Sequence, residues 1–268
     1  MRVQYNFIQM DTTTSYRDFI LNCIPKIKRY DQESFCWRTD GNGQEYAILT
    51  EMKAKHKDFA DAIDGLDERL SRDCVSKYYE DYYTGVIATL MWGGYHKSKF
   101  NRLEKILSIG KDNIEKSVAK VDNLLSQNKI QDAFLALESG DCHINGIGVS
   151  YLTKILYFLG KGKSLPEQPL IYDSVQMMTH AALLIDDGAV DVKEYYARAS
   201  KYSLRGLKRS VELYKDYIQR VNRLSKTCGL EPDQQEAYLF GRPLRGKVDP
   251  DNPRRKTRDF VLCYLKCH

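Results

Sequence analysis

From about residue 48 to the C-terminus, hydrophobic positions recur every three to four residues, and Gly, Pro, Asp or Asn interrupts the pattern at intervals. This period is that of an α-helix with one buried face. The interruptions are typical of helix ends and loops. The chain is therefore expected to be mainly α, with helices over residues 59–79, 83–92, 99–109, 114–127, 129–139, 148–160, 174–185, 192–229 and 233–241.

The first 47 residues follow a different pattern. Residues 15–30 have helical spacing and predict a short helix that ends near Pro25, whereas residues 33–49 predict an extended segment around a Gly-Asn-Gly turn. We expect residues 1–47 to form a mixed segment packed on a helical domain of residues 48–268. The Gly-, Lys- and Pro-containing stretch 159–169 is a candidate connection between two helical lobes.

The length and net charge of the chain give limited information about its stability and its partners. The chain has 268 residues, enough to bury a core without metals or disulfides. Its 41 Lys and Arg against 36 Asp and Glu give a net charge of +5, which is compatible with a polyanion partner but does not require one. Basic residues concentrate in segments 198–210 and 241–258, which favours such a partner.

The cysteines and the hydrophobic runs indicate where the protein works. Seven cysteines at irregular spacings argue against a disulfide framework and for a reducing compartment, so a cytoplasmic protein is expected. Only Cys263, Cys267 and His268 cluster, and a metal would need ligands from elsewhere, so buried helix cysteines are the preferred interpretation. No run of about 18 apolar residues occurs, so no membrane association is expected.

Two glycines mark the first candidate site. Residues 129–160 predict two helices joined by a tight turn that contains Ile144, Gly146, Ile147 and Gly148. Glycines at this spacing allow unusual backbone angles, and their amides lie at the positive end of the second helix, where they can approach an anion or a phosphate-bound cation. The isoleucines would hold the two helices together. The motif predicts a phosphate clamp, and the alternative is an ordinary turn between two helices.

Asp173 marks the second candidate site. It follows the apolar segment 169–172 and stands where the next helix is expected to begin. Taken alone, an aspartate at this place is best explained as a helix N-cap.

Together, these segments carry a resemblance. "INGIGVSYLTKILYFLG" followed by "PLIYDSVQ" resembles the helix-hairpin-helix superfamily of DNA glycosylases and is particularly similar to bacterial 8-oxoguanine-glycosylase-like proteins. "IATLMWGGYHKSKFNRLEKIL" (87–107) is similar to that group's Trp-Gly segment, and "DQQEAYLFG" (233–241) to its terminal Glu-x-x-Leu-Phe helix. The resemblance covers roughly residues 80–241 and has three segments in the same order.

The resemblance implies a two-lobed, mainly α fold and excision of a modified base from double-stranded DNA. In such a reaction Asp173 would be catalytic: its carboxylate would stabilise the developing sugar cation and orient the attacking water. The four-cysteine iron–sulfur spacing of some relatives is absent, so no cofactor is expected beyond a monovalent cation at the hairpin. We expect a monomer.

One position departs from the family pattern. Backbone-cleaving members carry a lysine nucleophile two residues after the second hairpin glycine, and this chain has Ser150 there. Lys154 lies one helical turn later on the same face and could act as the nucleophile, bind a phosphate, or be a plain surface lysine. Without a lysine at position 150, the enzyme is expected to be monofunctional, releasing the base and leaving an abasic site.

Further DNA contacts are expected around residues 92–97. Trp92 is a candidate wedge for the gap left by a flipped base, with burial in the core as its alternative. Tyr95, His96 and Lys97 follow Gly93 and Gly94, which would let a strand approach closely, and are expected to contact DNA, as are the hairpin residues including Ser150. Tyr172, beside Asp173, is a second candidate for the base pocket or wedge.

The substrate and the biological role stay open. An 8-oxoguanine-like lesion fits the resemblance, and a hypermodified pyrimidine of phage DNA, for example a glucosylated one, fits the altered lysine position equally well. The first would serve repair and the second anti-phage defence. A non-catalytic DNA-binding or damage-sensing module and a helical scaffold without nucleic acid are the alternatives from other classes.

Overall fold

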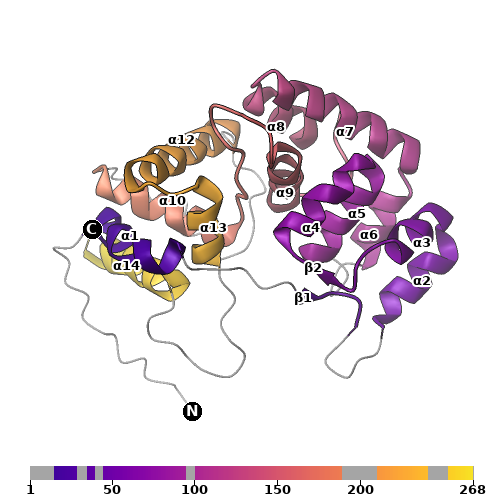
Figure 1. The fold of residues 1–268 in the computed structure, drawn as a ribbon, viewed down its shortest axis with the longest axis horizontal. Coiled ribbons are helices and arrows are strands. Elements are labelled where there is room, and N and C mark those ends of the chain that lie inside the picture. The colour runs from indigo at the N-terminus through magenta and orange to yellow at the C-terminus, as the bar shows by residue number, and fades with distance from the viewer. Residues whose placement is uncertain are drawn as a thin grey trace, which may run out of the picture. The chain divides into compact units, whose positions relative to one another are not determined.

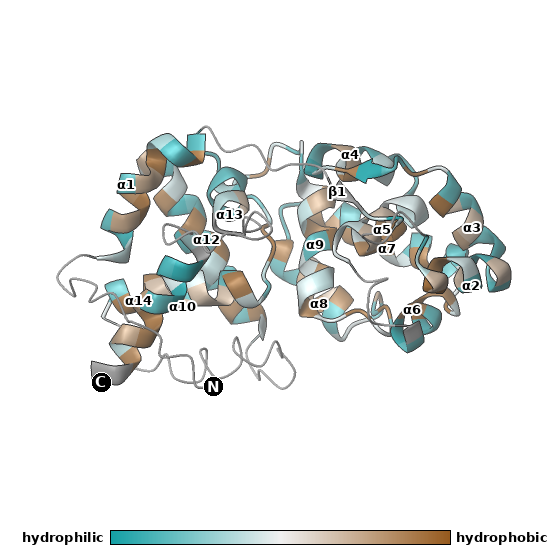
Figure 2. Cartoon of the chain, turned by 90° about the horizontal axis from the view of Figure 1, so that it is seen from below, coloured by the Kyte–Doolittle hydropathy of each residue, from teal (hydrophilic) through white to brown (hydrophobic). Residues whose placement is uncertain are grey.

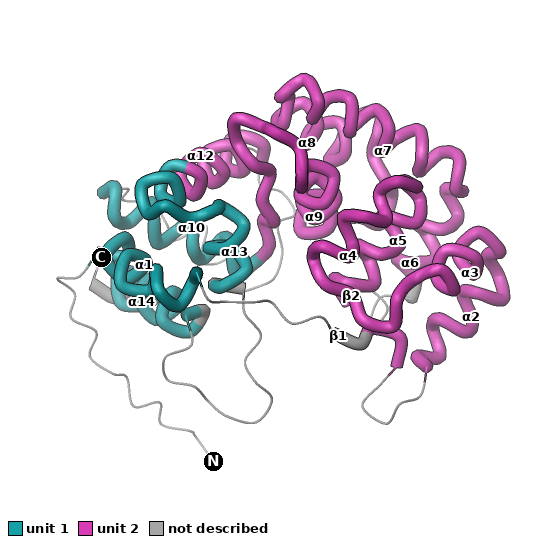
Figure 3. Tube along the Cα trace, viewed as in Figure 1, with its two compact units in different colours: residues 1–30, 174–203, 223–268 teal, residues 31–173, 204–222 magenta. Residues whose placement is uncertain are grey.

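The protein is mainly α-helical, as the periodicity predicts (Figure 1). The computed structural model describes residues 15–28, 35–39, 45–94, 100–188, 210–240 and 253–267. The chain divides into two compact units (Figure 3). Unit 1 comprises residues 1–30, 174–203 and 223–268, and unit 2 comprises residues 31–173 and 204–222. Each unit therefore combines segments that lie far apart in the sequence.

Unit 2 contains the middle of the chain. Its described elements are β1 (Phe35–Cys36), α2 (Ala47–Lys55), α3 (Lys57–Asp64), β2 (Arg69–Leu70), α4 (Arg72–Lys77), the 3-10 helix η1 (Tyr78–Glu80), α5 (Tyr82–Trp92), α6 (Phe100–Leu107), α7 (Lys111–Ser126), α8 (Ile130–Glu138), α9 (Val149–Gly160) and the first part of α12 (Ser210–Cys228).

Helix α5 forms the centre of unit 2. It packs against α3, α4, η1, α7 and α9, and almost all of its residues are buried. A helix that is apolar on all sides can be stable in water only when other elements surround it. The Asp81 carboxylate accepts the Thr84 N–H at 2.7 Å and so fixes where α5 begins. Figure 2, coloured by hydropathy, shows that the helices of both units carry both hydrophobic and hydrophilic residues.

The single helix expected over residues 59–79 is wrong. α3 ends at Asp64 with Gly65 as its C-cap, and α4 starts only after Ser71, whose Oγ accepts the Cys74 N–H at 3.1 Å. Between them β2 pairs antiparallel with β1, in the segment that the sequence predicts to be extended. The cap residues were visible in the sequence, but the pairing partner lies more than thirty residues upstream.

Unit 1 is built around α10 (Ser174–Asp186). This helix packs against α1 (Tyr16–Lys28), α13 (Pro232–Phe240) and α14 (Pro253–Cys267). The last part of α12 also belongs to this unit. The sequence pattern did not predict α14 as a separate helix. Residues 192–209, the first part of the helix expected over residues 192–229, lie outside the described residues.

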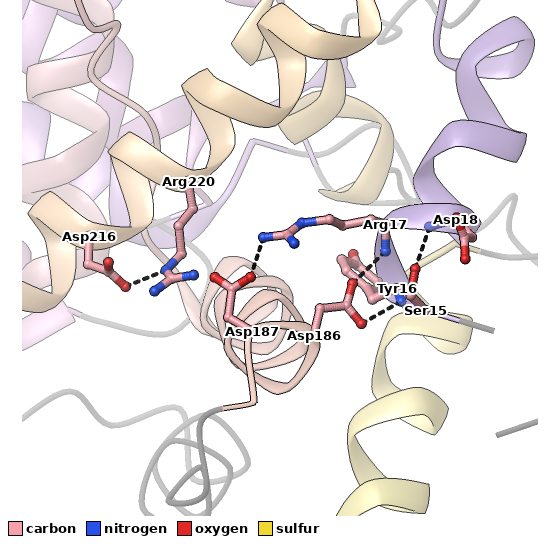
Figure 4. Close-up of polar contacts among 8 residues, drawn as sticks. All are labelled: Ser15, Tyr16, Arg17, Asp18, Asp186, Asp187, Asp216 and Arg220. Carbon is pink, nitrogen blue, oxygen red and sulfur yellow. Dashed lines mark hydrogen bonds and ion pairs between the residues drawn. The ribbon is translucent and has the colours of Figure 1, made fainter. Parts of the chain in front are cut away.

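The N-terminal helix is fixed by the end of α10 (Figure 4). The Asp186 carboxylate accepts the N–H groups of Tyr16 at 2.8 Å and Arg17 at 2.7 Å, and the Arg17 side chain pairs with Asp187. A helix N-terminus has four N–H groups without helical partners, and this carboxylate satisfies two of them. The Tyr16 hydroxyl lies 3.0 Å from Thr257 Oγ1 of α14, and burial raises its pKa.

The expected end of this helix near Pro25 is also wrong. α1 continues through Pro25 to Lys28. A proline inside a helix loses one hydrogen bond and crowds the preceding turn. Ile20, Cys23 and Ile27 are buried on either side of the proline, so packing in unit 1 keeps the helix continuous.

The observed division of the chain does not follow the expected boundary at residue 47. α1 belongs to unit 1, whereas β1 and the residues after it belong to unit 2. The change from unit 2 to unit 1 falls between Asp173 and Ser174, a few residues after the expected connection at residues 159–169. Within the described part of the chain, no helix combines the length and the hydrophobicity that crossing a membrane would require.

Candidate functional site

A tight turn joins α8 to α9 in unit 2. The Ile147 N–H donates to the Ile144 carbonyl at 3.1 Å, and α9 begins where Tyr151 and Leu152 donate to the Gly148 carbonyl at 2.8 and 3.0 Å. Ile144 and Ile147 are buried, and α8 packs against α9. Of the two glycines, Gly148 is exposed and Gly146 is partly buried.

The two glycines of this turn have different roles. Gly146 has a φ of +101°, and a Cβ there would lie 3.0 Å from both the Arg102 carbonyl and an Ile106 side-chain carbon. Gly148 has an ordinary φ of −102°, and a Cβ there would meet nothing within 4 Å. Gly146 is thus required by the fold. Gly148 is exposed and leaves the N-terminus of α9 open, at the positive end of the helix dipole.

Lys154 lies one turn into α9 and is only 4% exposed, so a plain surface lysine is the wrong interpretation. Its Nζ donates to the Ser150 carbonyl at 3.0 Å and to Ser150 Oγ at 2.9 Å, and it lies 5.0 Å from the centre of the Tyr151 ring. The structure therefore brings the amine of Lys154 to Ser150, the residue at which the resemblance implies a lysine.

Asp173 follows a segment that is joined to α9 by one buried hydrogen bond. The Tyr172 N–H donates to Thr153 Oγ1 at 2.9 Å, and that hydroxyl donates in turn to the Val149 carbonyl at 2.9 Å. Lys154 follows Thr153 in the chain and Asp173 follows Tyr172, so each candidate residue is one position away from this bond. Asp173 itself is 8% exposed.

Residues 168–172, called here the strap, are held on their other side by α12. The strap contacts are two hydrogen bonds between Asn222 and the Gln168 backbone at 3.0 and 3.3 Å, one from the Tyr214 hydroxyl to the Leu170 carbonyl at 2.9 Å, and stacking of Tyr172 on Tyr217 at 4.9 Å between ring centres. The backbone that leads into Asp173 is thereby fixed from two helices. Such fixation holds a catalytic group in place before the substrate arrives.

Trp92 and Tyr172 are core residues in this structure. Trp92 is 3% exposed, lies edge-on to Phe158 at 5.3 Å between ring centres, and has the Arg72 guanidinium 5.4 Å from the centre of its ring. Tyr172 is 1% exposed within the strap. The packed-core alternative therefore accounts for Trp92, and a base-pocket or wedge role for either residue stays a prediction that requires a movement.

The segment after Trp92 can be followed only in part. The Tyr151 hydroxyl donates to the Gly93 carbonyl at 2.7 Å, and a Cβ on Gly93 would lie 2.4 Å from the Tyr151 ring. Gly93 thus allows close packing between α5 and α9, and the approach of a DNA strand at Gly93 and Gly94 stays a prediction. Tyr95, His96 and Lys97 lie outside the described residues, and their DNA contacts stay predictions.

Five free cysteines have described side chains, and three of them are buried while Cys74 and Cys263 are partly exposed. Burial, followed by the charge of Asp141, raises the pKa of Cys142 beside the hairpin to about 11, so this thiol is neutral near pH 7. Within the described ranges, no group of three or more His, Cys, Asp or Glu side chains could hold a metal ion. The monovalent cation expected at the hairpin stays a prediction.

Sequence reasoning missed the residues that hold the strap. The strap is contacted by Thr153, Tyr214 and Asn222, which lie 19, 44 and 54 positions, respectively, from their partners in the sequence. A threonine inside a helical pattern, or a tyrosine in a chain with 19 of them, carries no local signal of such a contact. The candidate aspartate was found because its motif is local, whereas its supports are not.

Comparison with known proteins agrees with this arrangement. Residues 31–240, more than half of the chain, match the model of the family described as "Putative 8-oxoguanine DNA glycosylase OGG-like protein". No curated protein and no solved structure matches the chain. The matched range includes the α8–α9 hairpin, the strap and Asp173, together with α13. The chain therefore belongs to the OGG-like family of 8-oxoguanine DNA glycosylase-related proteins.

Proposed function

We propose that the protein is a DNA glycosylase that excises a modified base from double-stranded DNA and leaves an abasic site. The observation that carries this proposal is that one helix, α9, begins at the open turn and is hydrogen-bonded to the strap that leads into Asp173. All of these residues lie within the range that matches the family model. This arrangement offers one position for a DNA phosphate and one for a carboxylate at the reacting sugar.

Binding would begin at the hairpin. The backbone N–H groups at the start of α9 have no side-chain cap, and Gly148 places no Cβ in front of them. A phosphate oxygen can then accept hydrogen bonds there and gain from the helix dipole. Contacts of this kind fix the register of the protein on DNA without reading its sequence. The target base would then have to leave the stack to be reached.

Asp173 would perform the chemistry. Breaking the bond between base and sugar develops positive charge on the sugar, which an ionised carboxylate stabilises. The same carboxylate can orient and deprotonate the attacking water. A carboxylate that is 8% exposed lies in surroundings of lower dielectric than water, where its interaction with a cation is stronger. A strap fixed before binding adds no reorganisation at the moment of reaction.

The lysine position favours base release without strand cleavage. Ser150 cannot form the imine that β-elimination requires, and its hydroxyl accepts a hydrogen bond from Lys154. Lys154 is held by Ser150 and lies against Tyr151, an arrangement that gives it a structural role in α9. We therefore assign the reaction to Asp173 alone, and a lyase step through Lys154 is the outcome that a trapping experiment would detect.

The substrate is decided by a panel of DNA duplexes that each carry one modified base. 8-Oxoguanine and a glucosylated pyrimidine of the kind found in phage DNA are the two substrate classes to compare, with an unmodified duplex as the control. Base release is read as strand breaks after alkali and as free base by mass spectrometry. Release of 8-oxoguanine would point to repair, and release of the sugar-bearing pyrimidine to defence against phage. Salt-dependent binding without release from any duplex would indicate a DNA-binding module.

A further inference from the structure

Thr153 connects α9 to the end of the strap that adjoins Asp173 through a hydrogen-bond relay. This side chain is fully buried. Its hydroxyl accepts the Tyr172 N–H at 2.9 Å and lies within donating distance of two α9 carbonyls, that of Val149 at 2.9 Å and that of Ser150 at 3.3 Å. This one hydroxyl thus connects carbonyls in the first turn of α9 with the backbone N–H of the residue before Asp173. The threonine is not required to continue α9, because α9 makes its own backbone hydrogen bonds.

The relay holds the backbone directly before Asp173, and the orientation of this backbone determines where the Asp173 carboxylate lies. The contacts from α12 fix the strap at Gln168 and Leu170 and through the Tyr172 ring. The Tyr172 amide adjoins Asp173 in the chain, and Thr153 holds it. Loss of the hydroxyl would remove the hydrogen bond that this buried N–H makes to α9, and the local backbone would then be free to move or to admit water.

We infer that Thr153 is a positioning residue of the proposed glycosylase: it holds the backbone before Asp173 in the orientation that reaction requires. The inference rests on the proposed function of Asp173. It assigns Thr153 no contact with DNA or base. A displacement of about 1 Å at a reacting group can lower a rate roughly 100-fold, so this role would be visible in turnover.

Thr89 provides a matched control in the same unit. It too is fully buried in a helix, donates to the carbonyl four residues earlier at 2.9 Å, and has a second partner, the Tyr79 hydroxyl, at 2.8 Å. Thr89→Val and Thr153→Val therefore each remove a fully buried helix hydroxyl that bonds the carbonyl four residues earlier and a group outside its own helix. Only Thr153→Val removes one next to Asp173.

The test compares Thr153→Val, Thr153→Ser and Thr89→Val with the wild type. We expect both valine variants to lower the melting temperature similarly. Thr153→Val should also reduce the single-turnover rate of base release at saturating enzyme by roughly 10- to 100-fold without changing DNA affinity. Thr153→Ser, which keeps the hydroxyl, should restore most of the rate. Equal rates for the two valine variants would overturn the inference.

Hydrogen exchange at the Tyr172 amide gives a readout that needs no turnover. Exchange should accelerate in Thr153→Val and stay slow in Thr89→Val, and unchanged protection in both would overturn the relay. If Thr153→Val does not fold, Thr153→Ala removes the hydroxyl without bringing a new methyl group to the Tyr172 N–H. Two results together would separate the relay from the chemistry: lost protection of the Tyr172 amide in Thr153→Val, and no base release by the wild type. They would overturn the proposed function and the positioning role of Thr153, but the hydrogen bond between Thr153 and Tyr172 would be confirmed.

Discussion

The hairpin before α9 and the strap before α10 differ in almost every physical respect. At the hairpin Gly148 is exposed, carries no side chain, and leaves the start of a helix open. The strap is buried, and side chains from α9 and α12 hold it through several contacts. An open backbone suits the binding of a phosphate, which must come and go. A fixed one suits a carboxylate whose position determines a rate.

This contrast predicts that affinity and chemistry can be changed separately. One helix, α9, starts at the hairpin and holds the strap through Thr153. Substitutions at its open end should therefore act on DNA binding, and substitutions at the strap on base release. A variant that altered both equally would show that the two regions act as one.

The largest effect is expected for Asp173→Asn. The developing sugar cation loses its proposed carboxylate partner, so base release should fall by roughly 100- to 1,000-fold while DNA affinity persists. Asparagine is as good a helix N-cap as aspartate, so the fold should not change. Asp81→Asn, the same change at the N-cap of α5, is the control and should release base normally. Near-normal excision by Asp173→Asn would remove this residue from the mechanism.

Gly148→Asp should weaken DNA binding by about tenfold or more, the equivalent of ~1.4 kcal/mol. The new carboxylate would lie at the N-terminus of α9 and repel the phosphate, and its Cβ would meet no protein atom within 4 Å. Gly148→Asn adds the same bulk without charge and should lose much less affinity. Salt titrations of both variants separate charge from shape. Undiminished binding by a folded Gly148→Asp protein would exclude the hairpin as the phosphate site.

Gly146→Ala should destabilise the fold by about 1–3 kcal/mol, because a non-glycine residue at a φ of +101° is strained and its Cβ would press on α6. Gly148→Ser should leave stability nearly unchanged, since serine is a preferred N-cap. Urea unfolding of the two variants compares these neighbouring glycines directly. Equal stability would mean that the turn can relax around either position.

The smallest signal is expected from borohydride trapping. Ser150 cannot form an imine, so the wild type should yield little or no covalent adduct with substrate DNA, and strand breaks should appear only after alkali. An adduct that disappears in Lys154→Gln would instead show that the nucleophile has moved one helical turn. Lys154 would then belong with Asp173 in the chemistry and not with the packing of α9.

The sequence predicts those features of the fold and the candidate site that depend on residues close together in the chain. The Gly-x-Gly turn, the amphipathic helices on either side of it and Asp173 all depend on neighbours within about one helix length, and the hairpin could be predicted from them. It failed where distant packing decides. α1 passes through Pro25 because buried residues on both sides hold it, and β2 interrupts an apparent helix by pairing with β1.

The same distinction applies inside the candidate site. Lysine is a residue type typical of protein surfaces, yet Lys154 is buried. Its burial depends on how α9 packs, which the hydrophobic periodicity alone does not specify. Trp92 could be a wedge or a core residue from its sequence context, and its contacts with Arg72 and Phe158 come from separate helices. The residues that hold the strap came only from the structure.

The most direct test of the account is single-turnover base release, measured for Gly148→Asp and Asp173→Asn at enzyme concentrations that saturate the DNA. If the hairpin binds and Asp173 reacts, saturation should restore the rate of Gly148→Asp to near the wild-type value, while Asp173→Asn should stay slow although fully bound. Recovery of Asp173→Asn at high concentration, or a Gly148→Asp rate that stays low when all the DNA is bound, would contradict the separation of binding from chemistry.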